Sequence, residues 1–105
     1  MSADRELLET AAEAAGLSIR LVLVDGSLDV GAHMPPWNPL ANDGDALRLA
    51  VNQLLQVTVA TDGVHVEGLT TNGVLPYAFE PHGADPYAAT RRAIVRAAAA
   101  LKGKT

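Results

Sequence analysis

The sequence contains no cysteine among its 105 residues. Disulfides, thiolate nucleophiles and cysteine-ligated metal sites are therefore excluded. The chain also has no apolar run near the roughly 20 residues that a membrane-spanning helix needs. Its acidic start, MSADRELLET, lacks the basic and apolar segments of a secretory signal. We therefore expect a cytoplasmic protein that does not enter a membrane.

Motifs for common catalytic and cofactor chemistry are also missing. The three histidines, His33, His65 and His82, show no metal-ligand spacing, and the sequence has no P-loop, no GxGxxG and no GxSxG. We expect no metal, no cofactor and no enzymatic activity. An enzyme remains open only if His82, Asp85 or Asp43 converge in a cleft.

Aromatic residues are few, with one Trp, two Tyr and one Phe, yet 49% of the residues are apolar. That apolar fraction is ordinary for a globular protein and argues against wholesale disorder. Because a chain of this length suits one hydrophobic core, we expect a single domain over residues 1–105.

The first third of the chain predicts a helix followed by two strands. Apolar residues at three-to-four spacing indicate a helix from Ser2 to Ala15, and Gly16 occupies the position of a left-handed C-terminal cap. The run from Leu17 to Gly31 has strand-like alternation on either side of an Asp25-Gly26 turn.

A short second helix is predicted from a cap at Asn42 or Asp43 to about Leu54. Its apolar stripe is expected to be its buried face and consists of Leu47, Val51 and Leu54.

The clearest hairpin in the sequence is QVTVATDGVHVEGL, residues 56–69. Asp62-Gly63 is predicted as its two-residue turn, with the glycine supplying a positive φ. This turn would place Val59 opposite Val66 on the apolar side of the hairpin.

The last two elements are a strand near Val74–Glu80 and a helix from Pro86 to about Leu101. Pro76 assigns the strand to a sheet edge or a bulge, and Asp85 is the expected cap of the helix. The predicted order is αββαβββα. We expect an α/β (α+β) sandwich with three helices and a mainly antiparallel sheet of about four to five strands.

Alanines crowd all three predicted helices. Small side chains let a helix lie close to its neighbours, so we expect tight packing within one chain, with a dimer seam as the alternative.

The net charge of −4 hides an asymmetry, because the last helix and the tail after it carry five basic residues and no acid. On a helical wheel Arg91 falls on the apolar face, where its permanent charge needs a partner. Either it pairs with an internal acid such as Asp43, Asp45 or Glu80, or it awaits an anionic ligand. In the second helix, Asp45 is expected to pair with Arg48 at i,i+3.

Trp37 lies between prolines just before the second helix, and these prolines stiffen its loop. Two interpretations of this residue remain open. As structure, the indole closes the open end of the core. As function, a rigid indole near arginines stacks a base or anchors a partner protein.

Two blocks of sequence resemble a known family. WNPLANDGDALRLAV, residues 37–51, matches a pattern of an aromatic with Asn-Pro followed by Asp-Ala-Leu-Arg-Leu. DPYAATRRAIVRAA, residues 85–98, resembles a family helix that opens with Asp/Asn-Pro and continues into Arg-Ala-Ile-Val. On these blocks the chain is similar to the phage ABA sandwich domain family and, more distantly, to phage NinX-like proteins. Its loop lengths differ from those of NinX-like members, and its Pro35-Pro36 pair is outside the family pattern.

The resemblance implies an α/β sandwich encoded by a phage or prophage, with no catalytic residue to carry over. The matched positions are candidates for structure or binding, namely Trp37, Asn38, Asp43, Arg48, Arg91 and Arg92.

We therefore expect a non-catalytic phage accessory protein in the host cytoplasm. Its expected partner is a small anionic or nucleotide-like ligand, such as a host-defence signal, or a host protein. A homodimer is also open. The alternative is a nucleic-acid-associated protein, which the net acidic charge disfavours, with a phosphate-binding stripe formed by Arg92, Arg96, Lys102 and Lys104.

Overall fold

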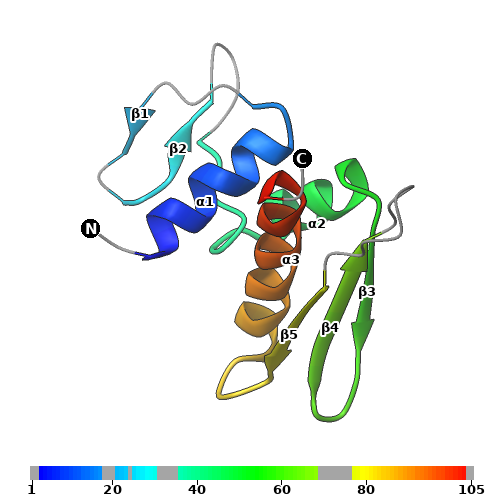
Figure 1. Ribbon diagram of the computed structural model, residues 1–105. Coiled ribbons are helices and arrows are strands. Elements are labelled where there is room, and N and C mark those ends of the chain that lie inside the picture. The colour runs from blue at the N-terminus through cyan, green and yellow to red at the C-terminus, as the bar shows by residue number, and fades with distance from the viewer. Residues whose placement is uncertain (1–2, 18–20, 24, 31–35, 69–76, 104–105) are drawn as a thin grey trace.

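The computed structural model describes residues 3–17, 21–23, 25–30, 36–68 and 77–103. Its elements are α1 (Ala3–Ala14), β1 (Leu21–Val22), β2 (Leu28–Asp29), α2 (Asp43–Asn52), β3 (Leu55–Val59), β4 (Gly63–Gly68), β5 (Tyr77–Pro81) and α3 (Pro86–Gly103). This order confirms the predicted sequence of elements and the α+β class (Figure 1). None of the described helices is long and apolar enough to cross a membrane.

The strands belong to two antiparallel sheets rather than the one sheet that we expected. β3, β4 and β5 form a three-stranded sheet in that order, while β1 and β2 form a separate two-stranded ribbon. Trp37 adds a further bridge to this ribbon. The Leu28 N–H donates to the Trp37 carbonyl at 2.8 Å, and the Trp37 N–H donates to the Leu28 carbonyl at 2.7 Å. Among the described strands, β5 lies at a sheet edge, as was predicted from Pro76, although Val74–Pro76 themselves lie outside the described residues.

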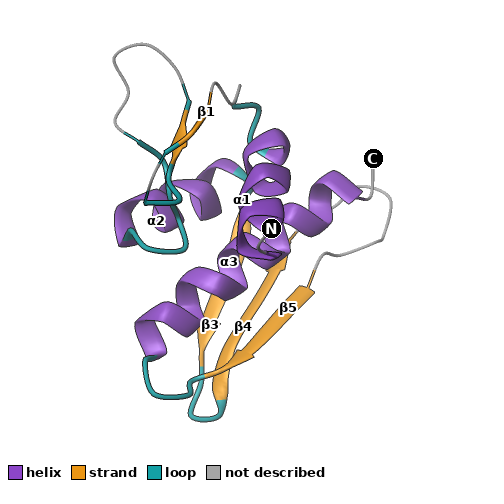
Figure 2. Ribbon diagram, turned by 90° about the vertical axis from the view of Figure 1, so that its left-hand side faces the viewer, coloured by secondary structure: helices purple, strands orange, loops and turns teal. Residues whose placement is uncertain are grey.

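The central element of the fold is α3, which lies between the three-stranded sheet and α1 and also packs on α2 (Figures 1 and 2). Its alanines make this possible, because Ala93, Ala97 and Ala98 are fully buried, as are Ala11 and Ala12 of α1. Small side chains allow close approach of the helices. The prediction that alanines serve packing within the chain is confirmed.

The predicted caps are found at the helix ends. Gly16 adopts φ 79°, and the N–H groups of Gly16 and Leu17 donate to carbonyls of the last turn of α1 at 3.0 and 2.9 Å. The Asn42 side chain accepts the Asp45 N–H at 2.9 Å at the start of α2. Asp85 Oδ1 accepts two backbone N–H groups of the first turn of α3, at 3.0 and 3.2 Å.

The register of the β3–β4 hairpin differs from the predicted one by two residues. Val57 pairs with Val66, and Val59 pairs with Val64. The turn residues are therefore Thr61 and Asp62, and the predicted Asp62-Gly63 turn with Val59 opposite Val66 is wrong. The shift by two keeps all four valines on one face of the sheet.

Gly63 is the first residue of β4, and it is not among the described residues with positive φ. Its missing side chain serves a different purpose from the predicted one. A Cβ at Gly63 would lie 2.3 Å from the carbonyl oxygen of Glu80 and 2.7 Å from the ring of Phe79. Only glycine therefore fits at this position next to β5. An Asp-Gly pair suits a turn and also a close strand contact, which explains the error.

The predicted buried stripe of α2 is also wrong. Leu47, Val51 and Leu54 are 64%, 68% and 69% exposed, whereas the buried apolar residues of α2 are Ala46, Leu49 and Ala50. α2 lies close to α3, and the alanines provide that close contact. Leu47, Val51 and Leu54 therefore remain exposed, while Leu49 is buried with the alanines.

Candidate binding cavity beside Trp37

Trp37 is fixed in place by pairing with a neighbouring strand and by a buried proline that follows it in the sequence. Its backbone pairs with Leu28 of β2, and the buried Pro39 follows it two residues later. The indole is only 7% exposed and belongs to the hydrophobic core. The structural interpretation of Trp37 is therefore confirmed, and its role in binding stays a prediction.

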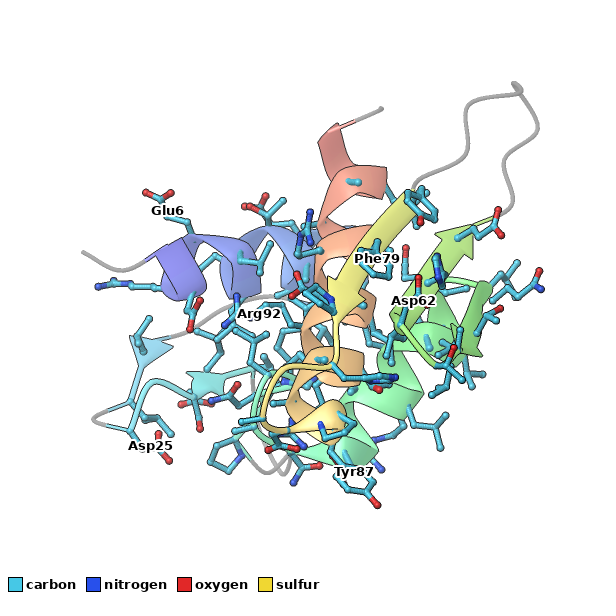
Figure 3. All side chains as sticks on the ribbon, turned by 90° about the horizontal axis from the view of Figure 1, so that it is seen from below. Glu6, Asp25, Asp62, Phe79, Tyr87 and Arg92 are labelled. Atoms are coloured by element: carbon cyan, nitrogen blue, oxygen red, sulfur yellow. The ribbon has the colours of Figure 1, made fainter. Side chains whose placement is uncertain are left out.

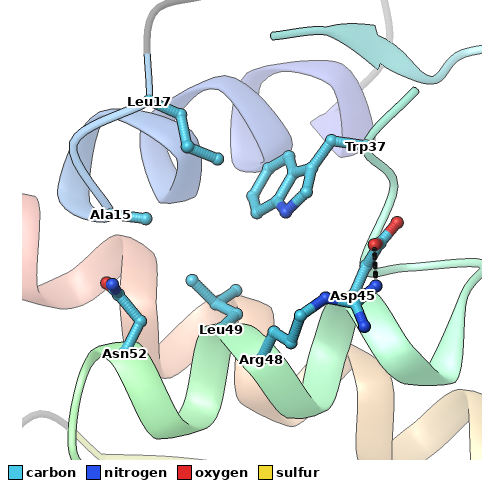
Figure 4. A pocket seen from close by; sticks show the side chains of 7 residues that line it. All are labelled: Ala15, Leu17, Trp37, Asp45, Arg48, Leu49 and Asn52. Atoms are coloured by element: carbon cyan, nitrogen blue, oxygen red, sulfur yellow. Dashed lines mark hydrogen bonds and ion pairs between the residues drawn. The ribbon is translucent and has the colours of Figure 1, made fainter. Parts of the chain in front are cut away.

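A cavity of about 390 Å³ lies beside the indole. Trp37 and Leu17 line one side of it, and Leu49, Arg48 and Asn52 of α2 line the other (Figure 4). The cavity lies where the chain leaving α1 comes close to α2. Its walls are mainly apolar, with polar groups contributed by α2.

An ion pair marks the polar end of this cavity. The Asp45 carboxylate is buried, and it accepts the Asn38 N–H and an Nη2–H of Arg48, both at 2.9 Å. Arg48 itself is 73% exposed, so most of its guanidinium faces solvent at the cavity. The predicted i,i+3 pair is confirmed. It aims a permanent cation beside an aromatic wall, which suits a planar ligand with an anionic group.

Asn38 positions the loop before α2. Its N–H binds Asp45, its side-chain oxygen accepts the Leu40 N–H at 3.2 Å, and its carbonyl accepts the Asn42 N–H at 2.8 Å. Its side chain thus stabilises the turn that carries Trp37 into place.

A second ion pair joins Asp43 of α2 to Arg91 of α3, away from the Trp37 cavity. Arg91 Nη1 donates to Asp43 Oδ1 at 2.6 Å, and its Nε donates to the Leu40 carbonyl at 2.8 Å. The prediction of an internal acid for Arg91 is confirmed. This pair lines a second hollow, so Asp43 and Arg91 do not share the cavity of Trp37 and Arg48.

Arg92 connects α3 to α1. Its two terminal nitrogens contact the two oxygens of Asp4 at 3.0 and 3.1 Å. The hydrogen bond that Arg92 donates to this carboxylate raises the pKa of Arg92 above its ordinary value. Arg96 likewise pairs with Glu80 and donates to the Phe79 carbonyl at 3.0 Å. Lys104 lies outside the described residues, and so does the side chain of Lys102.

The groups that an enzyme would need have structural contacts. His82 Nε2 lies 2.6 Å from the Ala60 carbonyl, which makes it the donor, and Asp85 caps α3. Asp43 pairs with Arg91, and His33 lies outside the described residues. Among the described residues, no group of three or more histidine or acidic side chains is arranged to hold a metal ion.

Sequence reasoning missed part of the cavity wall. Leu17, Leu49 and Asn52 line it, and none of the three was predicted as a site residue. The available signal was the C-terminal cap at Gly16, which turns Leu17 back toward the core.

The matched positions of the two sequence blocks thus line three different hollows. Trp37 and Arg48 share the cavity, Asp43 and Arg91 line the second hollow, and Asn38 and Arg92 line a third. The resemblance to the phage ABA sandwich family stays a prediction. The chain matches no protein-family model, no curated protein and no solved structure.

Proposed function

We propose that the protein acts by non-covalent binding of a small planar ligand that carries an anionic group, and that the ligand occupies the cavity between Trp37 and Arg48. The observation that carries this proposal is the placement of the single tryptophan and an anchored, solvent-facing arginine in one cavity.

The chemistry of the walls supports this class of ligand. The apolar side of the cavity is formed by Ala15, Leu17 and the small exposed parts of Trp37 and Leu49, and a flat ring would contact these groups. Arg48 offers donors in a planar fork that suits a carboxylate or phosphate. A volume of about 390 Å³ is near the lower end of small-molecule sites, which favours a single nucleotide or a smaller heterocycle.

As the biological setting, we propose a phage or prophage accessory protein in the host cytoplasm that sequesters a nucleotide-like host-defence signal. The resemblance of residues 37–51 and 85–98 to phage proteins supports this setting, and so does the ligand chemistry of the cavity. The nucleic-acid alternative is less favoured, because the chain carries a net charge of −4.

Native mass spectrometry of gently purified protein, followed by thermal unfolding with a panel of mono-, di- and cyclic nucleotides, tests the proposal. We expect a retained or added ligand mass and stabilisation of about 2.7 kcal/mol at a ligand concentration 100 times Kd. Arg48→Ala should weaken binding about tenfold or more, because it removes a charge-assisted hydrogen bond.

Arg5→Ala provides the matched control, since Arg5 lies on α1 in an exposed pair with Glu9 and does not line the cavity. It should bind as the unchanged protein does. An apo mass together with no stabilisation by any nucleotide would contradict the ligand proposal and favour a host protein as the partner.

A further inference from the structure

β3 forms an edge of the three-stranded sheet, and no described strand pairs with its outer side. The Ala60 N–H donates to the Gly63 carbonyl at 2.8 Å, which fixes the alternation of the ladder. In an antiparallel pair every second residue bonds to its neighbour, and the residues between them direct their N–H and C=O groups outward. Leu55, Val57 and Val59 therefore present backbone donors and acceptors to the open edge.

The two edges of this sheet differ in how they are protected. β5, at the opposite edge, contains Glu80 and ends in Pro81. Charged residues and proline are usual devices that prevent strand addition at an edge. β3, with the sequence LQVTV, has no charge, no proline and no glycine. The unprotected edge is therefore β3.

The sequence of β3 is self-complementary in antiparallel pairing about Val57. Val57 would face its own copy, Leu55 would face Val59, and Gln56 would face Thr58. All apolar side chains would then meet apolar ones on one face of the sheet, and the polar pair would meet on the other. The three outward-facing residues would exchange hydrogen bonds with the same three residues of the second copy.

An apolar groove lies beside this edge on the helix side of the sheet. Its volume is about 490 Å³, and Leu47, Val57, Val59 and Tyr87 line it. Three of these four side chains, all but Val57, are more than half exposed, and Figure 3 shows Tyr87 projecting away from α3. Large exposed apolar patches usually mark interaction sites. The lining charges, Asp43 and Arg91, neutralise each other, so two copies of the groove would not repel.

We propose that β3 is the interface of a homodimer, in which two copies pair antiparallel about Val57 and form one continuous sheet. The apolar grooves of the two copies lie next to each other across the axis, and Leu47, Val59 and Tyr87 become buried. A second copy is the occupant that the self-complementary strand fits. This surface is separate from the Trp37 cavity, so the dimer does not depend on the proposed ligand.

Sedimentation equilibrium or light scattering over a concentration series provides the first test. The unchanged protein should reach twice the mass of one chain. Val59→Lys should raise the dimer dissociation constant at least about tenfold, because it would bury an unpaired charge beside Leu55 of the second copy. Val59 is exposed in one copy, so this change leaves the fold intact. Tyr77→Lys, an exposed position on the protected edge, is the control and should remain dimeric.

Cysteine cross-linking tests the register, since the chain has no cysteine of its own. Val57→Cys should form a disulfide-linked dimer, because hydrogen-bonded residues in antiparallel strands have Cα atoms about 5.5 Å apart, within disulfide range. Thr58→Cys should not, because its own copy would lie about 8 Å away, given about 3.4 Å per residue and about 4.8 Å between strands.

Three results would overturn the dimer. They are a single-chain mass at every concentration, equal cross-linking of the Val57 and Thr58 variants, and assemblies that grow with concentration without stopping at two copies.

Discussion

The two sides of α2 differ in a way that their sequence does not suggest. One side carries Ala46, Leu49 and Ala50, which are almost completely buried. The other carries Leu47 and Val51, which are mostly exposed. The side of α2 that carries its two alanines and Leu49 is therefore buried, while Leu47 and Val51 remain exposed.

This difference teaches that the contact distance between helices decides which face is buried, more than the size of the side chains does. A helix lying close to an alanine-rich partner needs small residues at the contact. Arg48, Leu49 and Asn52 of α2 line the Trp37 cavity, whereas Asp43, Ala46 and Leu47 line the groove beside β3. One helix therefore contributes residues to two separate hollows.

The largest effect should come from Trp37→Ala, in the wall of the cavity. Removing the core indole should cost about 3–5 kcal/mol of unfolding free energy. Tyr87→Ala, in the groove beside β3, should change it by about 0.5 kcal/mol or less in a single chain. Urea unfolding followed by circular dichroism measures both. A cost below about 1 kcal/mol for Trp37→Ala would show that the indole does not support the core.

Neighbouring residues of α2 allow a sharper comparison. Ala50→Leu should cost about 1–3 kcal/mol, because the extra atoms have no room at a buried position. Val51→Leu should be nearly neutral, because Val51 is exposed. Denaturant midpoints of the two variants give the difference. Equal costs at both positions would mean that Val51 is packed against other atoms in solution rather than exposed.

Removal of the N-terminal cap of α2 should have an intermediate effect on stability, because the cap supports the whole helix rather than one of its two sides. Asn42→Ala removes the acceptor of the Asp45 N–H and should cost about 1 kcal/mol. Asn42→Ser keeps an acceptor and should remain close to the unchanged protein. Thermal unfolding of the pair checks this, and equal losses in both variants would contradict a capping role.

The smallest effect is expected outside α2, in the turn that precedes β2. The Ser27 N–H donates to Asp25 Oδ1 at 3.0 Å, and this bond lowers the pKa of Asp25 below its ordinary value of 3.8. The stabilisation is present in full above that ordinary pKa, and it is lost as the pH falls through the lowered pKa of the folded state.

Carboxyl carbon NMR should therefore give a titration midpoint for Asp25 below 3.8. Asp25→Asn should be slightly less stable than the unchanged protein near neutral pH, and the gap should close in acid. A midpoint at or above the ordinary value would contradict the turn hydrogen bond.

The sequence predicted features that depend on neighbouring residues. The caps at Gly16, Asn42 and Asp85 each need only a few residues in a row, and all three are found. The Asp45–Arg48 pair follows from helix spacing alone. The partner of Arg91 was predicted as one of three acids because a charge on an apolar face requires one.

The features that were missed depend on distances between elements. The buried face of α2 is set by how closely it approaches α3, and the role of Gly63 is set by the ring of Phe79 on another strand. The Trp37 cavity is formed where the end of α1 meets α2. No local pattern in the sequence encodes these contacts.

Fluorescence of the single tryptophan tests the central claim most directly, because Trp37 is itself a wall of the proposed site. Titration with nucleotides should change its emission saturably for at least one of them. The affinity obtained from this titration should be about tenfold or more weaker in Arg48→Ala and unchanged in Arg5→Ala. Emission that no nucleotide alters, or a response that survives unchanged in Arg48→Ala, would contradict binding in this cavity.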